Sequence, residues 1–86
     1  MRFSSCLPWL GLGNNQLTGT IPAGLGQLGA LAGLYLNGNQ LSGPVPLELG
    51  QLGGLGALYL YDNLLTGHEA FREYMQEHNP DCDLVL

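Results

Sequence analysis

The side chains best suited to metal binding or catalysis lie close together in the sequence, near the C-terminus. His78, Asp81, Cys82 and Asp83 carry groups that bind metal ions, and Cys82 with a histidine is the kind of pair that forms a thiol nucleophile. A structural zinc site needs four ligands, usually in paired spacing such as Cys-x₂-Cys, which this segment lacks. No arrangement of oxyanion donors accompanies the thiol. The segment is therefore interpreted as a helix end with a buried cysteine and two solvated carboxylates.

A second chemical pattern is formed by the glycines at positions 24, 26 and 29, which match the Gly-x-Gly-x-x-Gly of dinucleotide-binding loops. In a true fingerprint this pattern follows a long strand and opens a helix whose N-terminus meets the phosphates. Neither element is indicated here, and 24 residues later Glu48 stands in place of the first glycine. We interpret the pattern as a by-product of an internal repeat, and we predict no cofactor.

The repeat has a period of 24 residues and governs most of the chain. Residues 10–33 and 34–57 are identical at 13 of 24 positions, residues 34–43 and 58–67 at six of ten, and no match continues after residue 67. Identical residues recur in columns: Leu10, Leu34 and Leu58; Leu12, Leu36 and Leu60; Asn15, Asn39 and Asn63; Leu17, Leu41 and Leu65; Gly19, Gly43 and Gly67. One unit alone buries almost nothing, so stacked units must share a continuous leucine core.

The spacing within each unit predicts its local structure. Leu34 and Leu36 alternate with period 2, so both should point to one side of a short strand. Asn39 falls where the chain must turn, and stacked copies of its amide are expected to form a structural asparagine ladder of Asn15, Asn39 and Asn63. Gly43 permits a turn with unusual dihedrals, and the leucines that follow at three-residue spacing predict a 3₁₀-like return path.

The unit as a whole resembles the leucine-rich repeat. Its Leu-x-x-Leu-x-Leu-x-x-Asn-x-Leu-x-Gly-x-Ile/Val-Pro pattern, which covers residues 7–67 in about three copies, is similar to the plant-type 24-residue subclass of plant receptor-like kinases and polygalacturonase-inhibiting proteins. The resemblance implies an α/β solenoid: a right-handed coil with short parallel strands on its concave face. It also implies a protein-binding role in signalling, defence or inhibition of a wall-degrading enzyme. No constellation of residues supports a catalytic site, so we predict no enzymatic activity.

The pattern changes after residue 67. Thr66-x-x-Glu69 has the form of a helix capping box with Thr66 as N-cap. One helical face then carries Ala70, Phe71, Tyr74, Met75 and His78. We predict a helix over residues 67–78 and a fourth strand over residues 82–86, which together cap the last leucines. The chain thus divides into an N-terminal lead (1–6), the repeats (7–67) and a C-terminal cap (68–86).

The strand positions that flank the buried leucines are the candidates for binding a partner. Tyr35 and Tyr59 stand one repeat apart, with Tyr61 two residues further on, and aromatic side chains among small residues suit a protein interface. The alternative is that tyrosine simply covers a β-sheet well. The predicted partner-binding residues of the concave face are Trp9, Tyr35, Asn37, Tyr59, Tyr61 and Asp62.

Composition limits the partners and the compartment. The net charge of −5 and the absence of lysine argue against nucleic acid, and no stretch approaches the roughly 20 apolar residues of a membrane span. Two cysteines make no disulfide framework, and three strand steps of about 4.8 Å separate Cys6 from Cys82 too far for a bond. With no Asn-x-Ser/Thr site present, these features favour a cytoplasmic over a secreted location. The apolar part of the first ten residues is better explained as a repeat strand than as a signal peptide.

Two hypotheses for function come from this pattern. The first is a module that binds another protein or peptide through the concave face, as part or terminal segment of a larger repeat protein. The second is a structural capping or scaffold segment with no binding activity of its own, which should gain stability when it is extended at its N-terminus. The oligomeric state is left open.

Overall fold

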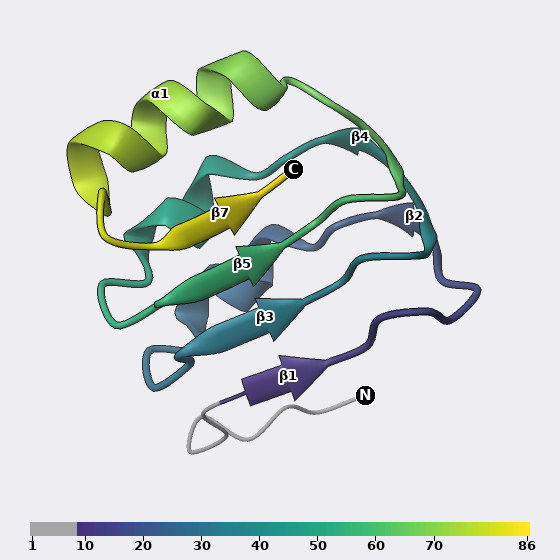
Figure 1. Ribbon diagram of the computed structural model, residues 1–86, viewed down its shortest axis with the longest axis horizontal. Coiled ribbons are helices and arrows are strands. Elements are labelled where there is room, and N and C mark those ends of the chain that lie inside the picture. The colour runs from purple at the N-terminus through teal and green to yellow at the C-terminus, as the bar shows by residue number, and fades with distance from the viewer. Residues whose placement is uncertain (1–8) are drawn as a thin grey trace.

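The computed structural model describes residues 9–86, which form two parallel sheets. The first sheet has the strand order β1-β3-β5-β7, with bounds Trp9–Gly11, Gly33–Tyr35, Ala57–Tyr59 and Asp83–Val85. The second has the order β2-β4-β6, with bounds Thr18–Thr20, Gln40–Pro44 and Leu64–Thr66. Figure 1 shows the first sheet as a ladder of strands side by side, with the second sheet behind it. Each repeat therefore contributes one strand to each sheet.

Short helices complete each repeat. The 3₁₀ helices η1 (Ala23–Gln27) and η2 (Leu47–Gln51) each begin after a proline in extended conformation, as the Ile-Pro and Val-Pro pairs of the sequence require. Their central leucines are buried, which agrees with the predicted 3₁₀-like return path. Parallel strands in sheets that alternate with short helices make this an α/β repeat fold, and this level of the prediction is confirmed.

The core lies between the two sheets and is built from the leucine columns. Strand pairing places Leu10 opposite Leu34 and Leu34 opposite Leu58, in the register that the 24-residue period predicts. Leu36 and Leu60, two residues further along, are buried directly after the ends of β3 and β5. Because each column continues through successive repeats, a leucine in one repeat is covered by its counterpart in the next.

Two columns of left-handed residues make the turns. The glycine column that contains Gly43, where unusual dihedrals were predicted, has φ of 85°, 80° and 73° at Gly19, Gly43 and Gly67. A second column lies directly before the ladder asparagines, with φ of 56°, 71° and 58° at Asn14, Gly38 and Asp62. Asparagine, glycine and aspartate tolerate this region best, so the residue types in the second column match the backbone that they occupy.

The second sheet was not predicted. Its strands Thr18–Thr20 and Leu64–Thr66 are only three residues long, and both contain mostly exposed side chains. Such segments carry no buried alternation, so hydropathy alone does not reveal them. They form because stacking brings each segment beside its copy in the next repeat, where Gly19 pairs with Leu41 and Gly43 with Leu65.

The last helix, α1 (His68–His78), begins differently from the prediction. Thr66 belongs to strand β6, the N-cap position is held by Gly67 in the left-handed conformation, and no side chain caps the helix. The predicted capping box is therefore wrong. Pairing of Thr66 with Pro44 keeps the threonine in the sheet, and Gly67 continues the column of left-handed glycines, so the chain turns one residue later than expected.

The helix lies at the end of the molecule that carries β7 and packs on η2 (Figure 1). Phe71 and Met75 are buried beneath it, whereas Ala70 and His78, which were predicted on the same face, are exposed. A Cβ added at Gly50 would lie 2.5 Å from the Tyr74 ring, so this ring rests directly on the backbone of η2. Gly26, the equivalent residue of η1, is approached in the same way by Glu48 of η2. The helix thus takes the place that the next 3₁₀ helix would occupy.

No helix among residues 9–86 has the length and apolar character needed to cross a lipid bilayer.

Candidate functional site

The outer surface of the first sheet gathers the aromatic residues of the repeats. We call it the tyrosine face, and it consists of the side chains opposite the buried leucines together with those of the following turns: Trp9, Tyr35, Asn37, Tyr59, Tyr61, Asp62 and Asp83. Strand pairing aligns Tyr35 with Tyr59 and aligns Trp9 with Gly33. The face therefore follows directly from the alternation of short strands, in which every second residue must point away from the core.

Three tyrosines form a continuous row on this face. The ring centroids of Tyr35 and Tyr59 are 5.1 Å apart, and the rings meet edge to face at 72°. Tyr61 lies 6.3 Å from Tyr59 in a tilted arrangement. Aromatic rings attract one another in such geometries, so each ring restricts the rotation of its neighbour. The row is partly exposed, and the exposed fraction of Tyr61 is 38%.

Trp9 extends the aromatic row to the first strand. A Cβ added at Gly33 would lie 2.3 Å from Trp9 Cδ1 and 2.9 Å from the Tyr35 hydroxyl oxygen, so both side chains lie over this glycine. Only glycine leaves room for them, which explains why Gly33 is buried in the middle of an outer face. Trp9 itself is 58% exposed and presents its remaining ring surface to solvent.

Asp83 joins the face from the last strand. The Tyr59 hydroxyl donates a hydrogen bond of 2.8 Å to Asp83 Oδ2. This bond, followed by the negative charge of the carboxylate, raises the pKa of Tyr59 above its usual value of 10.0. Sequence reasoning named Asp83 only as a candidate metal ligand. Its outward position could have been inferred from the predicted fourth strand, in which Cys82, Leu84 and Leu86 point inward and Asp83 alternates with them.

Asn37 and Asp62 lie at the turns that follow the strands. The Asn37 side chain covers Gly13, where an added Cβ would lie 3.1 Å from Asn37 Oδ1. The backbone carbonyl oxygen of Asn37 accepts a hydrogen bond from the backbone N–H of Asn14. Asp62 is exposed and takes the left-handed conformation directly after Tyr61. The two residues therefore border the aromatic row, at the end of the strands opposite Asp83.

Beneath this edge the ladder asparagines connect the repeats. Asn39 Nδ2 donates to the carbonyl oxygens of Leu12 and Leu36, each at 2.9 Å, and Asn39 Oδ1 accepts from the Leu17 N–H at 3.2 Å. Asn63 repeats this pattern one repeat later, with Leu36 and Leu60 as acceptors. Each amide thus satisfies backbone groups of two adjacent repeats, which holds their turns at a fixed spacing.

The first ladder asparagine makes only half of these bonds. Asn15 Nδ2 donates to the carbonyl oxygens of Leu12 and Gly13, both in its own repeat. Within residues 9–86, Asn15 Oδ1 accepts no hydrogen bond, and no carbonyl of a preceding repeat is within reach. The contacts that Asn39 makes to Leu12 and Leu17 have no equivalent at Asn15 among residues 9–86.

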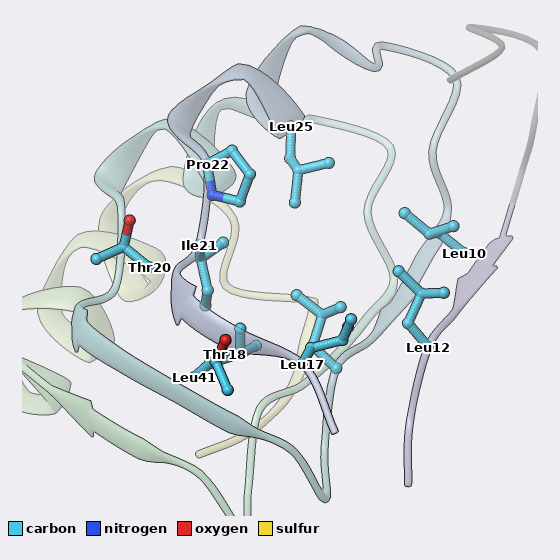
Figure 2. A pocket seen from close by; sticks show the side chains of 10 residues that line it. Leu10, Leu12, Leu17, Thr18, Thr20, Ile21, Pro22, Leu25 and Leu41 are labelled. Atoms are coloured by element: carbon cyan, nitrogen blue, oxygen red, sulfur yellow. The ribbon is translucent and has the colours of Figure 1, made fainter. Parts of the chain in front are cut away.

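A hollow of about 280 Å³ lies in the first repeat, which contains Asn15. Figure 2 shows Leu10, Leu12, Leu17, Ile21 and Leu25 pointing into it from the first repeat. Leu17 is 37% exposed, whereas its counterparts Leu41 and Leu65 in the next two repeats are buried. The hollow is the surface on which another repeat would stack, with the same leucines that the second repeat uses.

A further buried amide, which sequence analysis did not single out, lies beyond α1. Asn79 directly follows the helix, and its Nδ2 donates to the carbonyl oxygens of Leu52 (3.1 Å) and Leu55 (3.2 Å). These carbonyls follow η2, at the far side from the ladder. Asn79 is buried and ties the helix end to the second repeat, a contact that the sequence alone does not signal.

The residues considered as metal ligands or as a nucleophile do not form a reactive site among residues 9–86. Cys82 is half-buried rather than buried, and burial followed by the nearby Asp83 charge raises the pKa of its thiol, which disfavours the thiolate. No three histidine, cysteine, aspartate or glutamate side chains of residues 9–86 gather as a metal site would require. Cys6 lies outside the described residues, so its predicted separation from Cys82 has no structural counterpart.

The glycine pattern at positions 24–29 lies within and just after η1. A Cβ at Gly26 would lie 2.6 Å from the Glu48 carbonyl oxygen of the next repeat. Close packing between repeats therefore accounts for this glycine, as the interpretation of a repeat by-product requires.

Comparison with known proteins agrees with the repeat geometry. A family model described as Leucine Rich Repeat matches residues 6–28 and 30–52, which together make up more than half of the chain. The two matched segments are adjacent and correspond to the first two repeats. No curated protein matches the chain.

Proposed function

Because the chain belongs to the leucine-rich repeat family, whose modules generally mediate protein–protein interaction, we propose that it is a protein-binding module that uses the tyrosine face. The observation that supports this proposal is the row of Trp9, Tyr35, Tyr59 and Tyr61, in which partly exposed rings hold one another in place. Large aromatic side chains whose motion is already restricted lose little entropy on binding, and they dominate the energetics of protein interfaces.

The proposal includes the finer features that the resemblance implies. The repeats over residues 7–67 are of the plant-type subclass, with residues 1–6 as a lead, and the module is part or terminal segment of a larger signalling or defence protein. The tyrosine face is the concave side of a right-handed solenoid. Gly19-x-Ile21-Pro22 and its copy at residues 43–46 support the subclass, because they place a left-handed glycine before an extended proline. The packing of α1 on η2 supports a cap over residues 68–86.

The test is affinity capture with the immobilised full chain and two double variants. Tyr35→Ala/Tyr59→Ala removes the centre of the tyrosine face. Leu47→Ala/Leu64→Ala removes exposed apolar side chains from η2 and β6, away from this face, and serves as the matched control. We expect proteins captured by the wild type to be retained by the control and lost from the tyrosine variant, with thermal unfolding followed by circular dichroism to verify folding. Equal capture by a folded tyrosine variant would refute the proposal.

A structural role is the second candidate, and the N-terminal hollow favours it. The hollow exposes leucines that other repeats bury, and within the described residues Asn15 makes hydrogen bonds only to its own repeat. In this alternative the chain is a capping or scaffold segment whose own surface binds nothing. One further repeat, copied from residues 34–57 and inserted before Leu10, should then raise the thermal unfolding midpoint by several degrees. An unchanged midpoint would count against this role.

A further inference from the structure

The charged side chains of the molecule are distributed unevenly around the tyrosine face. The face carries two carboxylates, Asp62 and Asp83, and both are exposed. Within residues 9–86 the single arginine or lysine is Arg72, which belongs to α1, and the histidines His68 and His78 are in the same helix. The tyrosine face therefore presents aromatic rings and negative charge without any positive charge of its own.

The two carboxylates stand at opposite ends of the tyrosine row. Asp83 contacts Tyr59 through its hydroxyl, at the end of the face where the strands begin, and Asp62 follows Tyr61, where they end. Asp83 uses one oxygen for Tyr59, and within the described residues its other oxygen accepts no hydrogen bond. A donor from a partner can therefore reach a carboxylate oxygen and a ring face at the same place.

Arginine is the side chain that satisfies both features together. Its planar guanidinium stacks on aromatic rings through a cation–π interaction and donates parallel hydrogen bonds to a carboxylate. A glutamate or aspartate in a partner would be repelled by Asp62 and Asp83, and among residues 9–86 the face carries no cationic side chain to compensate.

We propose that the tyrosine face binds an extended basic segment of a partner protein, with arginine side chains stacked on the tyrosine row and paired with Asp83. This inference rests on the proposed function, since it names the chemistry of the partner for the same surface. Four strands spaced about 4.8 Å apart span roughly 14 Å, which four to five extended residues would cross. At Gly11, which pairs with Tyr35, an added Cβ would meet nothing within 4 Å, so there is space beside the tyrosine ring for the partner backbone.

The probe for the test is an end-blocked octapeptide of alternating arginine and glycine, with glutamate in place of arginine as the peptide control. Affinity for the full chain is measured by isothermal titration calorimetry. The emission of Trp9, which is the only tryptophan of the chain, reports whether the peptide reaches this face. We expect the arginine peptide to bind and to change Trp9 emission, and the glutamate peptide to do neither.

Two single-charge variants separate a local contact from general attraction to an acidic protein. Asp83→Asn keeps an acceptor for the Tyr59 hydroxyl but removes the charge, and Glu73→Gln removes one charge from the exposed surface of α1. We expect Asp83→Asn and Tyr61→Ala each to weaken binding by about fivefold or more, and Glu73→Gln by less than about twofold. Thermal unfolding of each variant verifies that β7 and the sheet remain formed.

The outcomes distinguish this inference from the function on which it rests. Equal weakening by Asp83→Asn and Glu73→Gln would overturn it, because binding would then follow total charge, and so would equal affinity for the glutamate peptide. If the arginine peptide fails to bind while protein capture still depends on Tyr35 and Tyr59, the basic partner is wrong and the protein-binding function stands. If capture is also independent of the tyrosines, both proposals fail.

Discussion

Replacement of the ladder asparagines by alanine offers a graded test of how the repeats are held together. Asn39 donates to Leu12 and Leu36 and accepts from Leu17, so Asn39→Ala leaves two carbonyl oxygens and one N–H without that partner. Asn15→Ala removes bonds that lie at the exposed edge of a single repeat. The two substitutions delete the same atoms, and only the burial and the bridging of repeats differ.

The structure indicates the size of the difference. A buried backbone group that loses its partner costs about 1–3 kcal/mol, and a solvent-exposed hydrogen bond is worth about 0.5–1 kcal/mol because water replaces it. Asn39 is 7% exposed, and its bond to Leu36 is fully buried while those to Leu12 and Leu17 are partly so. We therefore expect Asn39→Ala to lower the free energy of unfolding by about 3–4 kcal/mol and Asn15→Ala by at most about 1 kcal/mol. Asn63→Ala, with its bonds partly buried, should lie between them.

Urea unfolding followed by far-ultraviolet circular dichroism measures these differences. A domain of this length has a free energy of unfolding of about 4–13 kcal/mol, so each variant should retain a measurable transition unless the wild type lies at the low end of that range. If the wild type lies at that low end, Asn63→Ala is the variant whose loss of unfolding free energy can still be measured. Equal destabilisation by Asn15→Ala and Asn39→Ala would refute the reasoning, because it would mean that contacts between repeats through the ladder add nothing to those within one repeat.

Two further predictions concern the packing between repeats and the titration of the tyrosine face. Gly26→Ala should destabilise the fold by about 1–3 kcal/mol, because the new Cβ would meet the Glu48 carbonyl oxygen. Gly29→Ala is the control: an added Cβ there meets nothing within 4 Å, so stability should change by less than about 0.5 kcal/mol. Urea unfolding of both variants measures the difference. The pKa of Tyr59 is raised in the folded state, so the stabilising contribution of its hydroxyl is present below pH 10 and is lost as the pH rises through the folded-state pKa. Spectrophotometric titration of the phenols should show one tyrosine ionising later than the others, and Asp83→Asn should shift it to lower pH; an unshifted titration would show that the carboxylate does not act on this hydroxyl.

Much of this architecture was predictable because the regular spacing of the leucines indicates which positions are buried. Leu10, Leu34 and Leu58 recur at one spacing, and only stacking in register buries all of them, so the first sheet and the core could be inferred together. The left-handed column before the ladder asparagines was also accessible, since Asn14, Gly38 and Asp62 are all residue types that tolerate positive φ.

Features that depend on neighbouring repeats were not accessible in the same way. The capping box at Thr66 is a local pattern. It does not form because Thr66 pairs with β4 as part of β6, and this long-range pairing cannot be read from a local pattern. The second sheet was not predicted for the same reason, since its short strands form only through pairing between repeats. For the tyrosine face, the sequence predicted which side chains share a surface, but the bond between Tyr59 and Asp83 depends on the register of β7 against β5.

The equivalent glycines of η1 and η2 have a consequence for how such a chain can change in length. Gly26 receives the backbone of the next repeat and Gly50 receives the ring of Tyr74, so a 3₁₀ helix and an α-helix are interchangeable neighbours for the same small platform. Duplication of one 24-residue unit in the interior would present α1 with an identical platform and would leave the sheet register intact. The fold can therefore be lengthened by whole units without redesign of the residues at its helical end.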